Sequence, residues 1–335
     1  MSESDGGSPG GALLPEGRAG ADDVALTEAI ARRYFLQDRS KVDIAREFGL
    51  SRFQVARLLR RAREDGIVRI EIGTPPGQVD SGLSAAVQSV LGVEQAVVVA
   101  TVPDQASSLT IRQLGQALAQ WLQESAVEGS VVGLGWSRIC DALVDQLSSL
   151  ERCTVVQLAG NLHRQGDTSG SVEAVRRVAA ISGGDAYPMY APMVVEDANT
   201  AASLCRQPEI AEAFQMMDHL DMAVVSVGPW GSRRSRVYDI VSAELQHAGH
   251  SAGVCGEISG RLFDVSGSPL PDLLDDRVVA ITLDQLKRVP LVAATAWGAE
   301  SALALRATVT AEWVTAVVVD EDLARALIDA CTSSV

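Results

Sequence analysis

Short, mostly apolar runs that alternate with helical stretches constrain the fold of this chain more than any other feature. The runs lie at residues 96–100, 131–134, 155–158, 223–227, 278–281, 291–294 and 316–319. Stretches with helical periodicity separate many of them, at 108–125, 137–149, 171–182, 200–217 and 321–331. A strand that is apolar on both faces must be covered on both faces, and intervening helices favour parallel pairing. The sequence therefore predicts an α/β domain with a mostly parallel sheet over residues 93–335.

The first 73 residues follow a different pattern. Residues 1–21 are rich in Gly, Ser and Pro, so we expect a disordered tail that cannot repay the entropy lost on ordering. Leu26, Ile30 and Tyr34 recur every four positions and predict a helix over 22–36. A shorter helix is expected over 41–48, followed by Gly49, which permits the positive φ of a tight helix exit.

A third helix is expected after Ser51, whose side chain is a favourable N-cap. Its apolar stripe has the spacing of one helical face. The stripe consists of Val55, Leu58, Leu59 and Ala62, and the opposite face carries Phe53, Arg57 and Arg60. Residues 67–72 alternate apolar and charged side chains, as a short β-wing does. Residues 22–73 are therefore predicted to be a winged helix-turn-helix DNA-binding domain, although three small helices also occur in plain interaction modules.

The charge distribution favours DNA binding over an interaction module. The whole chain has 28 Lys or Arg and 43 Asp or Glu, a net charge of −15, which by itself argues against a polyanionic partner. Residues 27–72, however, carry a net charge of +4, whereas residues 73–335 carry −15. The positive charge is concentrated where the three helices are predicted.

A Thr-Pro-Pro-Gly segment at residues 74–77 ends this region, because consecutive prolines disfavour both helix and strand pairing. Residues 81–91 have helical periodicity. We therefore expect 74–92 to form a linker and a bridging helix, which would act as a lever. Residues 93–335 would then form the effector-binding and oligomerisation domain.

Two predicted strand ends in this domain could hold a ligand. The strand at 131–134 runs through Gly133 into Gly135, Trp136 and a helix that starts near Ser137, where backbone N–H groups can receive an anion. Arg138 could add a charge-assisted contact. The spacing resembles the start of a dinucleotide fingerprint, but Arg138 occupies the place of the third glycine.

The strand at 155–158 is followed by Gly160, Asn161, His163 and Arg164, which could bond sugar hydroxyls or a phosphate. Each loop alone is more often an ordinary strand-to-helix turn, but together they favour a phosphate or sugar pocket. Glu257, from a later loop, could accept hydrogen bonds from hydroxyls. Arg233, Arg234 and Arg236 form a basic cluster, which either binds an anion or pairs with acidic residues across a subunit contact.

The remaining composition indicates neither a metal nor another cofactor. The five cysteines are scattered, and His247 and His250 lack the further ligands of a usual metal site. No stretch reaches the roughly 18 apolar residues of a membrane span, and no leader pattern is visible, so we expect a cytoplasmic protein.

Two sets of motifs resemble the SorC family of sugar-responsive bacterial transcription regulators, which is grouped loosely with DeoR-type regulators. Residues 33–35, 43–45, 49–52 and 55–68 resemble its DNA-binding head. Residues 133–136, 157–160, 190–192, 253–264 and 294–298 resemble its effector domain in order and spacing. The resemblance covers about residues 24–330. It implies an effector domain similar to sugar-phosphate isomerases and deaminases, and a dimer or tetramer on operator DNA that responds to a phosphorylated sugar or related metabolite.

The resemblance also implies an effector site. Its members are Gly133, Gly135, Trp136, Ser137, Gly160, Asn161 and Glu257. Where the family usually has a lysine, this chain has Ser301, so the site would either take a less anionic effector or use Arg138 or Arg164 as its cation.

The third predicted helix would enter the major groove. We expect Arg52 and Arg57 near base edges, because a guanidinium matches the paired acceptors of guanine, and Phe53 against a thymine methyl. The expected contacts to the DNA backbone are Lys41, Ser51, Gln54, Arg60, Arg61 and Arg69.

The alternative function is an isomerase-like or deaminase-like enzyme with an accessory DNA-binding head. Glu257, His163 and Asp141 would be its acid–base candidates. They form no recognisable constellation, so we expect a regulator with no catalytic residues rather than an enzyme.

Overall fold

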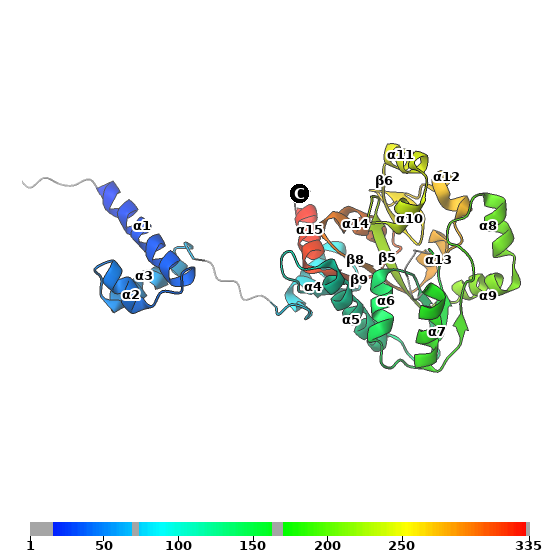
Figure 1. Cartoon of the computed structure of the whole chain (residues 1–335), viewed down its shortest axis with the longest axis horizontal. Coiled ribbons are helices and arrows are strands. Elements are labelled where there is room, and N and C mark those ends of the chain that lie inside the picture. The colour runs from blue at the N-terminus through cyan, green and yellow to red at the C-terminus, as the bar shows by residue number, and fades with distance from the viewer. Residues whose placement is uncertain (1–15, 69–73, 163–169, 333–335) are drawn as a thin grey trace, which may run out of the picture. The chain divides into compact units, whose positions relative to one another are not determined.

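The protein divides into two compact units, Met1–Gly73 and Thr74–Val335 (Figure 1). The structure is a computed structural model that describes residues 16–68, 74–162 and 170–332. Each unit is described on its own.

The first unit consists of α1 (Glu16–Phe35), α2 (Lys41–Glu47) and α3 (Arg52–Glu64). Its helix α1 begins at Glu16, so the last residues of the expected tail 1–21 are helical. The expected β-wing at 67–72 falls mostly outside the described residues.

The helices of the first unit pack around one small core. Ile30, Ile44, Val55 and Leu59 are buried in it, and α3 contributes the predicted apolar stripe. Ser51 forms a capping box with Gln54: each side chain accepts a hydrogen bond from the other residue's backbone N–H. The three predicted helices are thus confirmed in type and order.

The second unit is built on a sheet whose parallel part has the order β1-β9-β8-β5-β2-β3-β4. These strands are β1 (Gln95–Val99), β2 (Val131–Leu134), β3 (Thr154–Gln157), β4 (Ala186–Tyr187), β5 (Met222–Pro229), β8 (Leu291–Ala296) and β9 (Ala316–Asp320). Each neighbouring pair along this path is parallel. The predicted parallel α/β sheet is confirmed.

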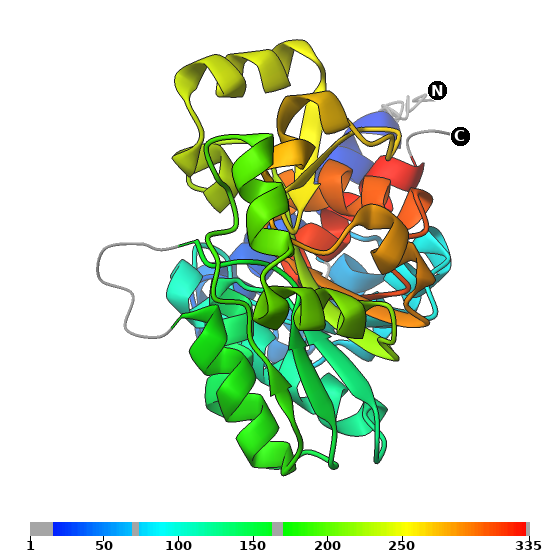
Figure 2. The same ribbon diagram turned by 90° about the vertical axis from the view of Figure 1, so that its right-hand side faces the viewer.

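Helices cover both faces of the parallel sheet (Figures 1 and 2). One face packs against α5 (Ser107–Ser125), α6 (Arg138–Gln146) and α7 (Ser171–Ser182). The other packs against α4 (Ser81–Leu91), α9 (Pro208–Met217), α14 (Ala302–Thr310) and α15 (Glu321–Thr332). Successive strand residues alternate between the two cores: Val224 faces the first and Val225 the second. This double coverage explains why the strands are continuous apolar runs.

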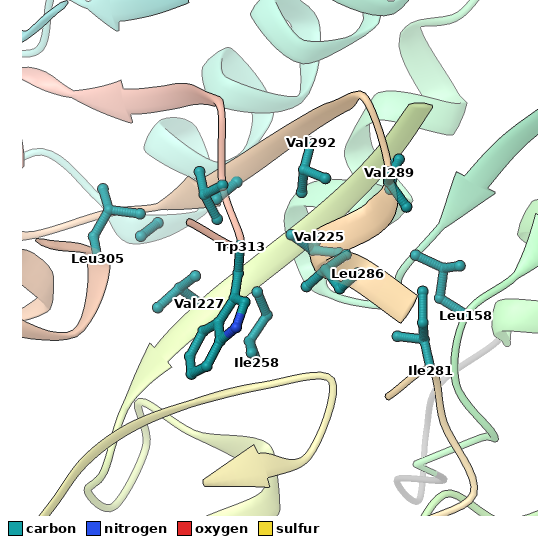
Figure 3. Packing of buried hydrophobic residues seen from close by; sticks show 14 of the residues in the cluster. Leu158, Val225, Val227, Ile258, Ile281, Leu286, Val289, Val292, Leu305 and Trp313 are labelled. Carbon is teal, nitrogen blue, oxygen red and sulfur yellow. The ribbon is translucent and has the colours of Figure 1, made fainter. Parts of the chain in front are cut away.

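Shorter elements complete the second unit. They are α8 (Ala198–Cys205), α10 (Arg236–Ile240), α11 (Ala243–Ser251), α12 (Pro271–Leu274), α13 (Leu283–Arg288) and the 3-10 turns η1 (Asp275–Arg277) and η2 (Ala299–Ser301). A hairpin of β6 (Val254–Ile258) and β7 (Arg261–Asp264) pairs antiparallel with the end of β5. In Figure 3, Trp313 lies beside Val227 of β5 and Ile258 of β6, so the hairpin shares the second core.

Two predictions within the sheet region were wrong. The apolar run at 278–281 is not a strand of the sheet but makes isolated bridges from Val278 to Val194 and from Ala280 to Ala159. Its side chains are apolar because they are buried, not because they pair in a ladder. The helix expected over 200–217 is two helices, since Pro208 begins α9 and cannot continue α8.

The helix expected to bridge the two parts is integrated into the second unit. α4 packs against α15 and β1, and its N-cap Asp80 accepts a hydrogen bond from the Leu83 N–H at 2.9 Å. The preceding residues run along β1, with Gly77 N donating to Ala100 O and Asp80 N to Val98 O, both at 2.8 Å. The segment 74–92 is therefore not a separate linker.

We expect Phe263→Ala to lower the free energy of unfolding by about 3–5 kcal/mol, because this fully buried ring packs edge-on against Trp313 at 5.5 Å. Urea unfolding followed by tryptophan fluorescence would measure it. Leu303→Ala, at a half-exposed position of α14, serves as the control and should change stability by less than about 0.5 kcal/mol. Equal losses in the two variants would contradict this packing.

Candidate functional site

A cavity of about 440 Å³ lies at the carboxyl ends of β2, β5 and β8. From β2 the chain continues outward to β3 and β4, and then returns to β5 on the other side of β2. Such a reversal of strand order opens a crevice at the carboxyl edge of a parallel sheet, where ligands commonly bind. The fold itself therefore positions this cavity.

The start of α6 forms one wall of the cavity. Gly135 is close to β5: its N–H donates to Val224 O at 2.8 Å, and a Cβ there would lie 3.0 Å from the same oxygen. Ser137 caps α6 by accepting from the Cys140 N–H at 3.1 Å. Ser226 of β5 donates to the Ser137 hydroxyl at 2.6 Å. A helix N-terminus and two hydroxyls thus face the cavity.

The segment that follows β5 contributes three arginines to the cavity lining. Arg234 forms an ion pair with Glu300 and lies over the Trp297 ring, 4.6 Å from its centroid. Arg236 lies over the Trp136 ring at 4.8 Å. Arg233 has a φ of 64°, which strains a non-glycine residue, and its N–H donates to an Asp239 carboxylate oxygen at 3.1 Å. The two tryptophans hold guanidinium groups at the cavity by cation–π contact.

Glu257 of β6 is a carboxyl group that also lines the cavity and contacts this segment. It accepts hydrogen bonds from the Gly260 N–H at 3.0 Å and from the Ser235 hydroxyl at 3.2 Å. Burial raises the pKa of Glu257 to about 7, although both hydrogen bonds act in the opposite direction. Near neutral pH this group can therefore be either a donor or an acceptor toward a ligand.

The exposed face of α3 is the second candidate site. Arg52, Phe53, Gln54, Arg57 and Arg60 are all exposed, and Phe53 is 86% exposed, which is unusual for an aromatic side chain without a partner. Within the described residues, the guanidinium groups of Arg52, Arg57 and Arg60 form no hydrogen bond or ion pair. An exposed basic face on a capped helix matches the electrostatic footprint of a DNA-binding element.

Four other predicted DNA contacts, Arg61, Gln54, Ser51 and Lys41, already have partners within the first unit. Arg61 forms ion pairs with Asp23 of α1 and with Asp65, so it joins α1 to α3. Gln54 and Ser51 are engaged in the capping box, and Lys41 lies 5.4 Å from the Tyr34 ring centroid. Arg69 lies outside the described residues.

A family profile described as "Putative sugar-binding domain" matches residues 78–329. The chain belongs to the SorC/DeoR family of transcriptional regulators. It is similar to a deoxyribonucleoside regulator of Bacillus subtilis (strain 168), with 24% identity over 91% of this chain and 97% of that protein. It is also similar to a sorbitol operon regulator of Klebsiella pneumoniae, with 24% identity over 92% and 99%.

The fold of this SorC-family chain is similar to that of a solved structure over most of its length. The full-length sorbitol operon regulator SorC from Klebsiella pneumoniae superposes with a TM-score of 0.67 at 21% identity, over 92% of this chain and 99% of that one. The relatives are transcriptional regulators and not enzymes, so the alternative of an isomerase-like or deaminase-like enzyme is set aside. None of the helices in the described ranges has the length and apolarity to cross a membrane.

The cavity of this SorC-family chain includes some of the residues predicted for the effector site. Those that line it are Gly135, Trp136, Ser137, Arg138 and Glu257. Gly133, Gly160, Asn161 and Ser301 are not among the residues that line this cavity, and their part in effector binding stays a prediction. His163 and Arg164 lie outside the described residues.

These four residues also have packing roles in the structure. A Cβ on Gly133 would lie 2.7 Å from a Leu158 methyl, and one on Gly160 would lie 2.6 Å from Ala191 O, so both glycines permit close approach of neighbouring chain. Asn161 accepts a hydrogen bond from the Ser171 hydroxyl. Ser301 is buried and donates to Trp297 O at 2.8 Å.

Some lining residues were not predicted. Ser226, Thr295, Trp297 and Asp239 contribute to the wall. Thr295 and Trp297 lie at the end of β8, and Ser226 is the last residue of β5 that pairs in the parallel sheet, so the same strand-end argument that identified Gly135 could have found them. The arginine cluster was recognised, but its partner Glu300 is in the same chain rather than across a subunit contact.

The raised pKa of Glu257 predicts a pH-dependent stability. Its pKa is about 7 in the folded protein and near its ordinary value of 4.5 when unfolded, so between these values the folded state retains a proton that the unfolded state loses. The stability that the protonated Glu257 contributes to the folded state is fully present below pH 4.5 and is lost as pH rises through 7. We therefore expect Glu257→Gln to melt progressively higher than the wild type as pH rises from 5 to 8. Calorimetric scans would measure this difference; a constant difference would refute it.

Proposed function

We propose that this SorC-family regulator binds operator DNA through α3 and that a phosphorylated sugar or related anionic metabolite in the second unit controls this binding. The observation that carries the proposal is the convergence of three arginines, a helix N-terminus and Glu257 on one cavity at the reversal of strand order. Two relatives are named for a deoxyribonucleoside and for sorbitol, which supports a sugar-related effector.

The chemistry of the cavity suits a ligand with one anionic end and several hydroxyls. Arg233 is exposed at the cavity, and within the described residues its guanidinium has no hydrogen bond or ion pair, so it is available to a phosphoryl group. Ser137, Ser226 and Glu257 offer hydroxyl and carboxyl partners for a sugar ring. Gly135, Trp136 and Arg138 complete this proposed site at the start of α6.

For DNA, we propose that Arg52 and Arg57 contact base edges, that Phe53 contacts a thymine methyl, and that Arg60 contacts phosphate. Lys41, Ser51, Gln54 and Arg69 remain proposed backbone contacts. Arg61 is a weaker candidate because Asp23 and Asp65 already neutralise it. Self-association into dimers or tetramers belongs to the proposal, since two heads would read the halves of a palindromic operator, and the chain would act in the cytoplasm.

A continuous set of contacts could carry the effector signal toward the first unit. At the cavity edge, the Gly298 N–H donates to Asp320, which also accepts from the Leu323 N–H in α15. Helix α15 packs against α4. Hydrogen bonds from Leu83 and Thr74 and, less strongly, the charge of Arg325 lower the pKa of Asp80 at the α4 N-cap. The Thr74 hydroxyl bonds Asp80 at 2.9 Å, and Thr74 is where the second unit begins.

We expect Arg57→Ala to relax sequence preference at one base pair and to weaken binding to the preferred site by about 1–3 kcal/mol. Selection of bound sites from a random duplex library would measure it. Arg63→Ala is the matched control, because the Arg63 guanidinium lies over the Phe35 ring, 5.4 Å from its centroid. Equal weakening on every sequence would instead assign Arg57 to phosphate contact.

We expect a member of a pentose and hexose phosphate panel to bind the full chain and raise its melting temperature. Arg233→Gln should weaken this binding by about tenfold or more, because it removes a charge-assisted hydrogen bond. The control Arg206→Gln alters an exposed arginine that bonds Ser203 outside the cavity lining and should bind normally.

The same titration repeated with selected operator DNA tests the regulatory part. An effector changes operator affinity only if its own affinity differs between the DNA-bound and free protein. Equal dissociation constants in the two titrations would exclude coupling, while leaving effector binding intact.

A further inference from the structure

Glu300 is paired with a residue of the cavity lining but is not itself part of that lining. It belongs to η2, the turn that follows β8, and it forms an ion pair with Arg234, a lining residue. The side chains of Arg234 and Glu300 are 34% and 41% exposed, so water reaches both. Arg234 is at the same time held over the Trp297 ring.

The local backbone aims the Glu300 carboxylate at this position. The Glu300 side chain folds back over Gly298, where a Cβ would lie 2.6 Å from a carboxylate oxygen, and the φ of 79° at Gly298 favours glycine. The Gly298 N–H bonds the buried Asp320 at 2.9 Å, and the Ser301 hydroxyl bonds Trp297 O at 2.8 Å. The turn is therefore anchored on both sides of Glu300.

We propose that Glu300 is the resident counter-ion of Arg234 and that the anionic group of a bound effector takes its place. A carboxylate and a phosphoryl group present similar paired acceptors to a guanidinium. Because Trp297 holds the guanidinium from its face, Arg234 can exchange one anion for another without leaving the cavity. This inference rests on the proposed function, since it concerns the same site.

The exchange makes Glu300 a specificity-determining residue. A partly exposed ion pair is worth only about 0.2–1 kcal/mol, so a phosphoryl group can displace the carboxylate, whereas a neutral sugar offers Arg234 no replacement charge. A ligand must break the ion pair to reach Arg234. A phosphorylated ligand recovers this cost through its own charge and an unphosphorylated one does not, so Glu300 favours phosphorylated ligands. A carboxylate that only orients Arg234 would behave differently, because its removal would weaken phosphate binding.

Titration calorimetry of the full chain with inorganic phosphate and with glucose 6-phosphate separates these two roles. We expect Glu300→Gln to bind both probes about two- to fivefold more tightly than the wild type, because the competing carboxylate is gone. Glu300→Ala should show the same gain, which guards against a folding defect of one variant. The Glu300→Gln change should give no gain in affinity once Arg234 is removed, so the double variant Arg234→Gln/Glu300→Gln should bind the probes no more tightly than Arg234→Gln alone.

Glu312→Gln is the matched control. It removes an equal charge from an exposed ion pair, with Lys287 at 2.7 Å, between residues that do not line the cavity. Its affinity for both probes should equal that of the wild type.

Two outcomes would overturn the inference. If the wild type binds a probe and neither Glu300 variant binds it more tightly, the counter-ion role fails while the proposed effector site stands. If neither the wild type nor any variant binds either probe, a phosphorylated effector in this cavity fails, and the counter-ion role fails with it.

Discussion

The change of partner along β5 is the constraint on which the rest of the second unit depends. Its first residues pair in parallel with β2 and β8, and its last residues pair antiparallel with β6. Where β5 pairs in parallel and both sheet faces are covered, its side chains must be apolar. The end of β5 leaves the parallel sheet and continues into the segment that carries the arginines. One strand therefore joins the two hydrophobic cores, supports the hairpin that carries Glu257 and forms the floor of the cavity.

The cavity combines groups whose charges are balanced by different means. Arg234 and Arg236 are held by tryptophan rings, and Arg234 also by Glu300. Glu257 is held by one backbone N–H and the Ser235 hydroxyl, and its burial favours the protonated form. Ser235 also caps α10, so Glu257 is connected to the segment that carries the arginines. A ligand that bonds Glu257 would therefore act on the same segment as one that bonds Arg233.

The sequence predicted the parallel sheet, the three N-terminal helices and one wall of the cavity, because each follows from local periodicity or from a strand end. Gly135 to Arg138 were found because they directly follow a strand at the reversal of order. Gly160 and Asn161 follow the next strand, and their neighbours Ala159 and Leu162 do line the cavity. Which side chains of such a loop face the cavity depends on long-range packing, which is not encoded in any short segment. The pairing of Arg234 with Glu300 joins residues far apart in the chain, so periodicity could not reveal it. The run at 278–281 showed burial correctly, but burial alone does not distinguish a ladder strand from isolated bridges.

Local arrangement, rather than net charge, determines which anions this protein can hold. A net charge of −15 suggests repulsion of both DNA and phosphorylated ligands. At physiological ionic strength, however, charges separated by more than about 8 Å are largely screened, so distant acidic residues contribute little at either site. The arginines of α3 and those that follow β5 are each concentrated within a few residues, and contacts at hydrogen-bonding distance dominate there. The acidic groups of the second unit instead affect how a polyanion approaches the protein. Their field disfavours contact with the second unit, so the basic face of α3 is the favoured point of approach.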